Sequence, residues 1–242
     1  MWREKIFRYW DDLRNGLDLM TSAIVAALRL FQVDGFNPER IRSLKSGIEI
    51  TLGAKIKVAA VLDKDYRSDK ERVEIIKECE AFCDFIYIYK RKEIENFVLV
   101  PTSIDCAARR KVADQSKRSG AKINYKTVSA SLLDEFATTQ KIYVTSQYIA
   151  ERRRFERTHS PALHETTVSA AALGEVEASW KDLESRLEVI PAKEALSAIN
   201  QVLQKEYGVN ITPTSIIDAM SIDEMPLEIK TLIKDVSEFS SL

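Results

Sequence analysis

Two aspartates separated by one residue are the sharpest candidate site in this sequence. Asp63 and Asp65 directly follow the apolar run at residues 55–62, so both carboxylates can extend from a turn at the end of a strand. Mg²⁺ and Mn²⁺ prefer carboxylate oxygens as protein ligands, and two such ions can clamp the attacking and leaving oxygens of a phosphodiester. Aspartates in loops also bend turns and cap helices, so a purely structural role is the alternative for this pair.

A second acidic pair, Glu93 and Glu95, follows the next β-forming run at residues 85–89. The carboxyl ends of parallel strands meet at one edge of a sheet, where ligand sites form. We therefore expect the two acidic pairs to open on the same edge. Glutamates also stabilise the positively polarised first turn of a helix, so a helix start is the alternative here.

Lys193 is the third candidate, because it opens a predicted helix just after Pro191 and Ala192. An ammonium at that position can steady negative charge that develops on a phosphate, and a solvated surface lysine is the alternative. The sequence has two histidines and no Cys-x-x-Cys pair, which argues against a zinc site. It also lacks a Walker-type Gly-rich loop for ATP.

A strand–helix–strand unit must position the two acidic pairs. Residues 55–62 and 85–89 are rich in β-forming and aliphatic side chains, and residues 71–82 between them carry apolar residues at helical spacing. Such a unit implies two parallel strands with a crossover helix, so the predicted fold class is α/β. Further helices are predicted at residues 38–52, 192–207, 213–220 and 226–239, and some β character at residues 187–190.

The sequence divides into a poorly defined helical segment at residues 1–31 and one domain at residues 32–242. Within that domain, residues 103–187 are predicted to be a polar, mostly helical insertion. The insertion contains two basic clusters, at residues 109–111 and 152–154, which could hold backbone phosphates or be solvated helix faces.

The composition is that of a globular protein without a bulk preference for nucleic acid. Among 242 residues, 36 Lys and Arg nearly balance 37 Asp and Glu, so the net charge is −1 and a basic surface would have to be local. Three cysteines, an odd number, and no secretion signal favour a reducing, cytoplasmic location. The most apolar early stretch, residues 19–31, is too short to span a bilayer, so we expect no membrane partner.

Two stretches carry a resemblance to a known family. Residues 58–69, VAAVLDKDYRSD, and residues 89–99, YKRKEIENFVL, are similar to the Toprim domain of the OLD (overcoming lysogenization defect) family of ATP-dependent endonucleases. In that family an Asp-x-Asp-Tyr-Arg-Ser strand end is followed by an Arg/Lys-Glu-Ile-Glu-Asn-Tyr motif. Residues 189–194, VIPAKE, resemble the family's later Pro-Gly-Lys motif, and the resemblance covers about residues 32–235 with gaps.

The resemblance implies a Toprim, Rossmann-like parallel sheet flanked by helices, with a helical insertion and a helical C-terminal region. It also implies cleavage of DNA phosphodiesters with Mg²⁺ or Mn²⁺, in phage defence, with an ABC-type ATPase as partner, and we expect a homo-oligomer. Asp63 and Asp65 would be metal ligands, and Glu93 or Glu95 a further ligand or a group behind the ligands. Lys193 would lie near the scissile phosphate.

The sequence departs from the family pattern in three ways. No Glu-Gly motif precedes Asp63, and the nearest equivalent is Asp34-Gly35. The ATPase domain is absent, and Ala192 replaces the glycine before Lys193. A truncated remnant, one half of a split system with a separate ATPase, and a diverged member all fit these departures. A catalytically inactive Toprim module for assembly or nucleic-acid binding, and a primase-like polymerase, are the alternative functions.

Overall fold

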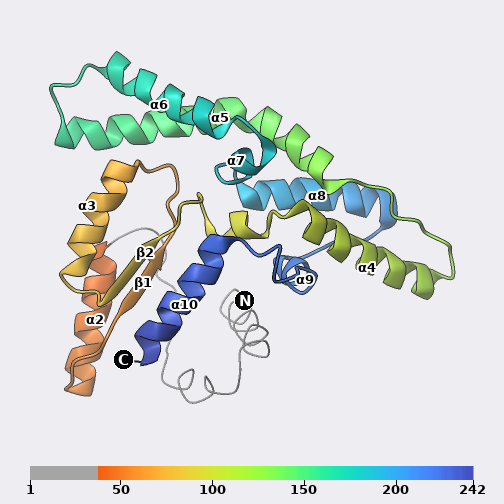
Figure 1. Cartoon of the computed structure of the whole chain (residues 1–242), viewed down its shortest axis with the longest axis horizontal. Helices are drawn as coiled ribbons and strands as arrows, with labels where there is room; N and C mark the ends of the chain where they lie inside the picture. Colours follow the sequence, from red (N-terminus) through yellow and green to blue (C-terminus); the bar gives the residue numbers. More distant parts are fainter. Residues whose placement is uncertain (1–37, 242) are drawn as a thin grey trace. The chain divides into compact units, whose positions relative to one another are not determined.

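The computed structural model describes residues 38–241, which form two compact units. The first unit consists of residues 38–62, 73–88 and 226–241, and the second of residues 63–72 and 89–225. The described chain is mixed α/β and mostly helical, with a small parallel sheet in the first unit (Figure 1). The N-terminal segment predicted at residues 1–31 and the dipeptide Asp34-Gly35 lie outside the described residues.

The sheet confirms the predicted parallel pair. Strands β1 (Ala59–Leu62) and β2 (Phe85–Ile88) run parallel, with Ala59 opposite Phe85 and Leu62 opposite Ile88. Strand β1 is shorter than the predicted run because the backbone before it is bound by side chains. The N–H of Ile56 donates to the Glu49 carboxylate at 3.2 Å, and the N–H of Val58 donates to the Asp84 carboxylate at 2.8 Å.

Two helices cover one face of this sheet. Helix α2 (Pro38–Leu52) has the predicted bounds, and α3 (Asp69–Glu80) begins two residues before the predicted helix. Ser68 caps α3, because its hydroxyl oxygen accepts the Glu71 N–H at 3.0 Å. The apolar core of the first unit joins α2, α3 and both strands through Ile41, Ala60, Ile75, Cys79, Cys83 and Ile88.

Helix α10 (Leu227–Ser241) covers the other face, as Figure 1 shows. Successive residues of a strand point to opposite faces of a sheet, so Phe85 and Tyr87 point away from the core that contains Ile88. The Phe85 ring lies 6.0 Å from that of Phe239, and the Tyr87 hydroxyl donates to Glu228 at 2.8 Å. The first unit is therefore a three-layer arrangement of helices, sheet and helix.

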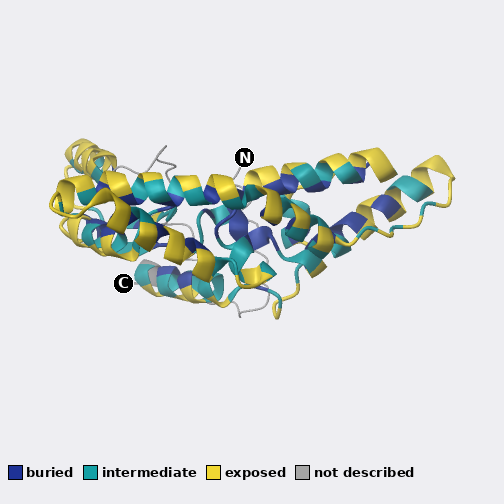
Figure 2. Ribbon diagram, turned by 90° about the horizontal axis from the view of Figure 1, so that it is seen from above, coloured by how far each residue is buried: buried dark blue, intermediate teal, exposed yellow. Residues whose placement is uncertain are grey.

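The second unit is helical. It contains η1 (Ile94–Val98), α4 (Pro101–Ser119), α5 (Ser129–His159), α6 (Glu165–Ser179), α7 (Leu183–Leu187), α8 (Ala192–Tyr207) and α9 (Pro213–Ile217). Helix α8 has the predicted bounds and ends at Gly208, whose φ of 66° suits glycine. The main apolar core of the second unit joins η1, α4, α5, α8 and α9. Buried and exposed positions alternate along the helices at helical spacing (Figure 2).

Residues 103–187 are mostly helical, as predicted, because α4, α5, α6 and α7 occupy this stretch. The β character predicted at residues 187–190 is wrong. Val189 and Ile190 form a turn in which both N–H groups donate to the Arg186 carbonyl at 3.1 Å. Their side chains are apolar because they are buried against helices, and a short apolar run cannot distinguish that environment from a buried strand.

Helices α5 and α6 form an antiparallel hairpin within the second unit. Lys141 near the middle of α5 pairs with Glu177 near the end of α6, and Arg153 pairs with Glu165 at the start of α6. A smaller core holds the hairpin together through Val144, Tyr148, Ala172 and Val176. Between residues 38 and 241, no helix combines the length and the apolar composition that a bilayer crossing requires.

Candidate active site

The loop after β1 is fixed by backbone contacts. Asp65 has a φ of 49°, a left-handed conformation that aspartate tolerates better than most residues. Its N–H donates to the Lys92 carbonyl at 2.7 Å. This bond joins the loop of the first acidic pair to the residue that immediately precedes Glu93.

Asp63 lies at the centre of the acidic residues. One of its carboxylate oxygens accepts the Ile94 N–H at 3.0 Å. Burial, together with the negative charges of Glu95, Asp65 and Glu93, raises the pKa of Asp63 to about 6, against the opposing effect of the Ile94 bond. The second acidic pair thus lies close enough to Asp63 to influence the ionisation of Asp63.

Asp65 is held by an arginine of the same loop. Its carboxylate accepts a hydrogen bond from the Arg67 guanidinium at 2.7 Å, and the Asp65 side chain is about half exposed. The Arg67 Nε also lies 3.6 Å from Glu71. The Asp-Lys-Asp-Tyr-Arg-Ser segment therefore contains the counter-charge for its own second aspartate.

Glu93 is buried, and both of its carboxylate oxygens are engaged. One accepts the Ala192 N–H at 2.9 Å, and the other lies 2.9 Å from the Lys92 ammonium. Ala192 is the first residue of α8. Glu93 therefore satisfies a donor at a helix N-terminus, as glutamates at such positions do, and this contact fixes the start of α8 beside the second acidic pair.

Glu95 pairs with Lys193. The Glu95 carboxylate is buried and lies 3.2 Å from the Lys193 ammonium, whose side chain is 63% exposed. Burial alone lowers the pKa of Lys193, but the charges of Glu95, Glu93 and Asp63, with the Glu95 hydrogen bond, outweigh it and raise the pKa. Lys193 is therefore a cation at neutral pH and reaches both the acidic cluster and solvent.

All five residues predicted from the sequence gather in the second unit. Asp65, Glu93 and Glu95 each pair with a cation of the protein, whereas Asp63 has no such partner among the described residues. A desolvated carboxylate flanked by other carboxylates suits a hard divalent cation. Residues 38–241 contain no set of three acidic, histidine or cysteine side chains already arranged around a metal position.

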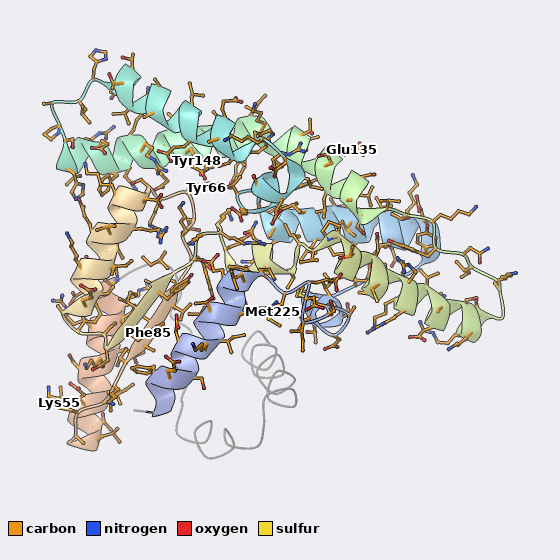
Figure 3. All side chains as sticks on the ribbon, viewed as in Figure 1. Lys55, Tyr66, Phe85, Glu135, Tyr148 and Met225 are labelled. Carbon is orange, nitrogen blue, oxygen red and sulfur yellow. The ribbon has the colours of Figure 1, made fainter. Side chains whose placement is uncertain are left out.

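Two further residues, which were not among the five predicted site residues, stabilise the segments that carry the acidic pairs. Asn96 is fully buried and donates to the carbonyls of Leu187 at 2.8 Å and Ile190 at 2.9 Å. Tyr66 is buried with its ring centroid 5.5 Å from that of Tyr148 (Figure 3). Both follow the acidic pairs directly in sequence, and that adjacency is the signal that could have indicated them.

Arg152 is a third such residue, and its position in the basic cluster at residues 152–154 conceals its role. Its buried guanidinium donates to the Tyr66 carbonyl at 2.8 Å and forms a two-point ion pair with Glu175. Arg154 in the same cluster pairs with Glu71 at 2.5 Å. This cluster connects the hairpin to the loop of the first acidic pair.

Comparison with protein-family models, with curated proteins and with solved structures gave no match.

Proposed function

We propose that this chain is a divalent-metal-dependent endonuclease that cleaves DNA phosphodiesters at a Toprim-type site. The observation that carries the proposal is the gathering of Asp63, Asp65, Glu93, Glu95 and Lys193 from three separate segments of the second unit. Glu93 also has a structural role at the start of α8, whereas Asp63 has no cation of the protein beside it among the described residues. Together the five residues match the charge pattern that phosphoryl transfer requires.

In this proposal Asp63 and Asp65 would hold Mg²⁺ or Mn²⁺, and Glu95 would be a further ligand if Lys193 turned away from it. When bound, the cation lowers the pKa of water and neutralises phosphate charge. Glu93 is a positioning residue, because its oxygens are already bound to Ala192 and Lys92.

Lys193 supplies electrostatic stabilisation in the proposed reaction. Hydrolysis forms a bond between the water oxygen and phosphorus and breaks the bond from phosphorus to the leaving oxygen, which then takes up a proton. The raised pKa of Lys193 keeps its ammonium charged, and its exposed side chain can move from Glu95 to a phosphate oxygen. We also propose a separate ATPase partner, a homo-oligomer and a cytoplasmic location. The support for these three points is the sequence resemblance and the cysteine usage alone.

The test is nicking of supercoiled plasmid by the purified chain with Mn²⁺, with EDTA as a control. The Asp63→Asn/Asp65→Asn variant keeps side-chain oxygens for the Ile94 bond and tolerates the left-handed backbone at residue 65. The matched control is Glu135→Gln/Asp223→Asn, which removes two exposed carboxylates elsewhere. Nicking that requires Mn²⁺, survives in the control and disappears in the site variant would support the proposal, and metal-independent nicking would contradict it.

A second candidate is an inactive Toprim module that binds nucleic acid or acts in assembly. It is favoured by the absence of a ready-made group of three metal ligands among residues 38–241. The pairing of Glu93 with Lys92 and of Glu95 with Lys193 also favours it. Titration calorimetry with Mn²⁺ separates the two candidates. Binding that is lost in Asp63→Asn/Asp65→Asn favours the nuclease, and no binding with no nicking favours the inactive module.

A further inference from the structure

The two basic clusters of the helical insertion have different environments. The side chains at residues 152–154 are engaged with protein carboxylates, because Arg152 pairs with Glu175, Arg153 with Glu165, and Arg154 with Glu71. Pairs of this kind neutralise positive charge before a ligand can use it. The cluster is consequently a poor candidate for binding phosphates.

The basic cluster on α4 and in the loop after it is not neutralised by carboxylates of the described residues in this way. Residues 101–128 contain seven Lys and Arg against two Asp, a net charge of +5 in a chain whose net charge is −1. One of the aspartates, Asp105, accepts bonds from the Tyr125 hydroxyl at 2.7 Å and from the N–H and hydroxyl of Ser129. The exposed cations are Arg109, Arg110, Lys111, Lys117, Arg118, Lys122 and Lys126.

These seven side chains have no carboxylate partner among the described residues. The hydrogen bonds recorded for them go to uncharged groups: Arg110 donates to the Asp218 carbonyl at 3.0 Å, and Arg118 donates to the Gln115 side chain at 3.0 Å. The exposed Asp114 lies on the same helix, and the stretch still has a net charge of +5. A net positive field of this kind attracts polyanions. We call the surface formed by these seven cations the α4 basic surface.

Helix geometry gives the α4 basic surface its length. Lys111 and Arg118 are seven residues apart, and so are Arg110 and Lys117, so each pair lies on one side of α4, about 10 Å apart along the axis. The five cations of α4 lie between residues 109 and 118, so they cover about 14 Å of the helix axis. That length corresponds to roughly four base pairs of duplex DNA at about 3.4 Å each.

The surface has the features of a backbone-binding face and lacks those of a base-binding face. Proteins that hold single strands stack bases on exposed aromatic rings. The aromatic residue of residues 101–128, Tyr125, is half-buried, its ring 5.4 Å from that of Tyr207. Lysine and arginine without aromatic partners bind the phosphates of a duplex without reading its sequence.

We infer that the α4 basic surface binds the phosphate backbone of duplex DNA. The inference rests on the proposed function for its biological role, because it names the surface that would hold the substrate of the proposed nuclease. Duplex binding itself does not depend on cleavage, since binding by these cations requires neither a metal nor the acidic pairs. Non-specific binding of this kind releases counterions and weakens steeply as salt rises.

The experiment measures binding of the full chain to a duplex of about 30 base pairs in EDTA, between about 50 and 200 mM salt. The test variant is Lys111→Gln/Lys117→Gln/Arg118→Gln, which keeps good helix formers at exposed positions of α4. The matched control is Arg153→Gln/Arg157→Gln/Lys181→Gln, which removes the same charge from the hairpin and the segment after it. Circular dichroism verifies that both variants retain the helical content of the parent chain.

We expect the test variant to bind on the order of 100-fold more weakly at low salt, and its salt slope to be smaller by about 3, because each lost phosphate contact removes about 0.9. Control and parent should bind alike. Equal binding by the test and control variants would overturn the inference, and so would tighter binding of a single strand than of the duplex.

The same assay distinguishes this inference from the proposed nuclease. The Asp63→Asn/Asp65→Asn variant should bind the duplex at least as well as the parent chain in EDTA, because it removes negative charge and leaves α4 unchanged. Duplex binding without any nicking would refute the nuclease and retain the surface. Metal-dependent nicking that is unaffected by the α4 substitutions, with unchanged duplex binding, would support the nuclease and refute the α4 basic surface.

Discussion

Glu93 accepts the N–H of Ala192 at 2.9 Å across 99 residues of sequence. The contact joins the segment that carries the second acidic pair to the helix that carries Lys193. It explains why Lys193, so distant in sequence, lies 3.2 Å from Glu95. The geometry of the candidate site therefore depends on Glu93, whose carboxylate already accepts a hydrogen bond from the backbone.

Replacing Glu93 tests this dependence. Glu93→Ala leaves the buried Ala192 N–H without an acceptor and Lys92 without its partner, so the free energy of unfolding should fall by about 1–3 kcal/mol. Glu93→Gln keeps an oxygen for Ala192 and should lose less. Urea denaturation measures both variants, and equal losses would show that the Lys92 ion pair, rather than the Ala192 bond, carries the stabilisation.

Arg152 is the second position whose contacts predict a change in stability. Arg152→Met removes the donor to the Tyr66 carbonyl and the ion pair with Glu175, and should lower the free energy of unfolding by about 1–3 kcal/mol. Arg153→Met is the matched control, because its pair with Glu165 is exposed and contributes at most about 1 kcal/mol. Denaturant unfolding measures the free energy of unfolding of both variants. Similar losses of stability in the two variants would contradict the assigned role of Arg152.

Asp63 predicts a pH dependence of stability. Because its pKa is raised to about 6 in the folded chain, the folded state binds this proton more tightly than the unfolded state. The free energy of unfolding should therefore fall as pH rises from about 4 to about 6. In EDTA at pH 8, Asp63→Asn should be more stable than the parent by on the order of 1–3 kcal/mol.

Below about pH 4 the advantage of Asp63→Asn should disappear, since the carboxyl group is then neutral in both states. Denaturation curves at a series of pH values between these limits measure the difference. Asp223→Asn, at an exposed position, controls for general effects of charge. A constant difference across the whole pH range would be incompatible with a raised pKa at Asp63.

For Lys193 we predict a loss of activity that exceeds the effect of its loss of stability. On the proposed function, Lys193→Met should reduce the rate of plasmid nicking on the order of 100-fold, the size typical of a lost electrostatic group. Its stability should fall by about 1–3 kcal/mol, because the buried Glu95 carboxylate is left without its cation. Lys205→Met, another exposed position of α8, is the control, and a rate equal to the parent's for Lys193→Met would remove Lys193 from the reaction.

The sequence by itself determined the local elements of this protein. The bounds of α2 and α8 follow from Pro38, Gly53 and Gly208, because these residues act on the backbone within a turn of their own position. The parallel pairing of β1 and β2 follows from the strand–helix–strand pattern. The sequence also indicated all five residues of the candidate site, because their motifs are short and contiguous.

Only the tertiary structure decided what those residues contact. The turn at Val189 and Ile190, the raised pKa of Asp63 and the use of Glu93 at the start of α8 each depend on partners far away in sequence. The two basic clusters are also alike in composition, and only the folded chain shows which one is neutralised by carboxylates. Burial and ion pairing are properties of neighbours in space, and a single sequence lists neighbours along the chain.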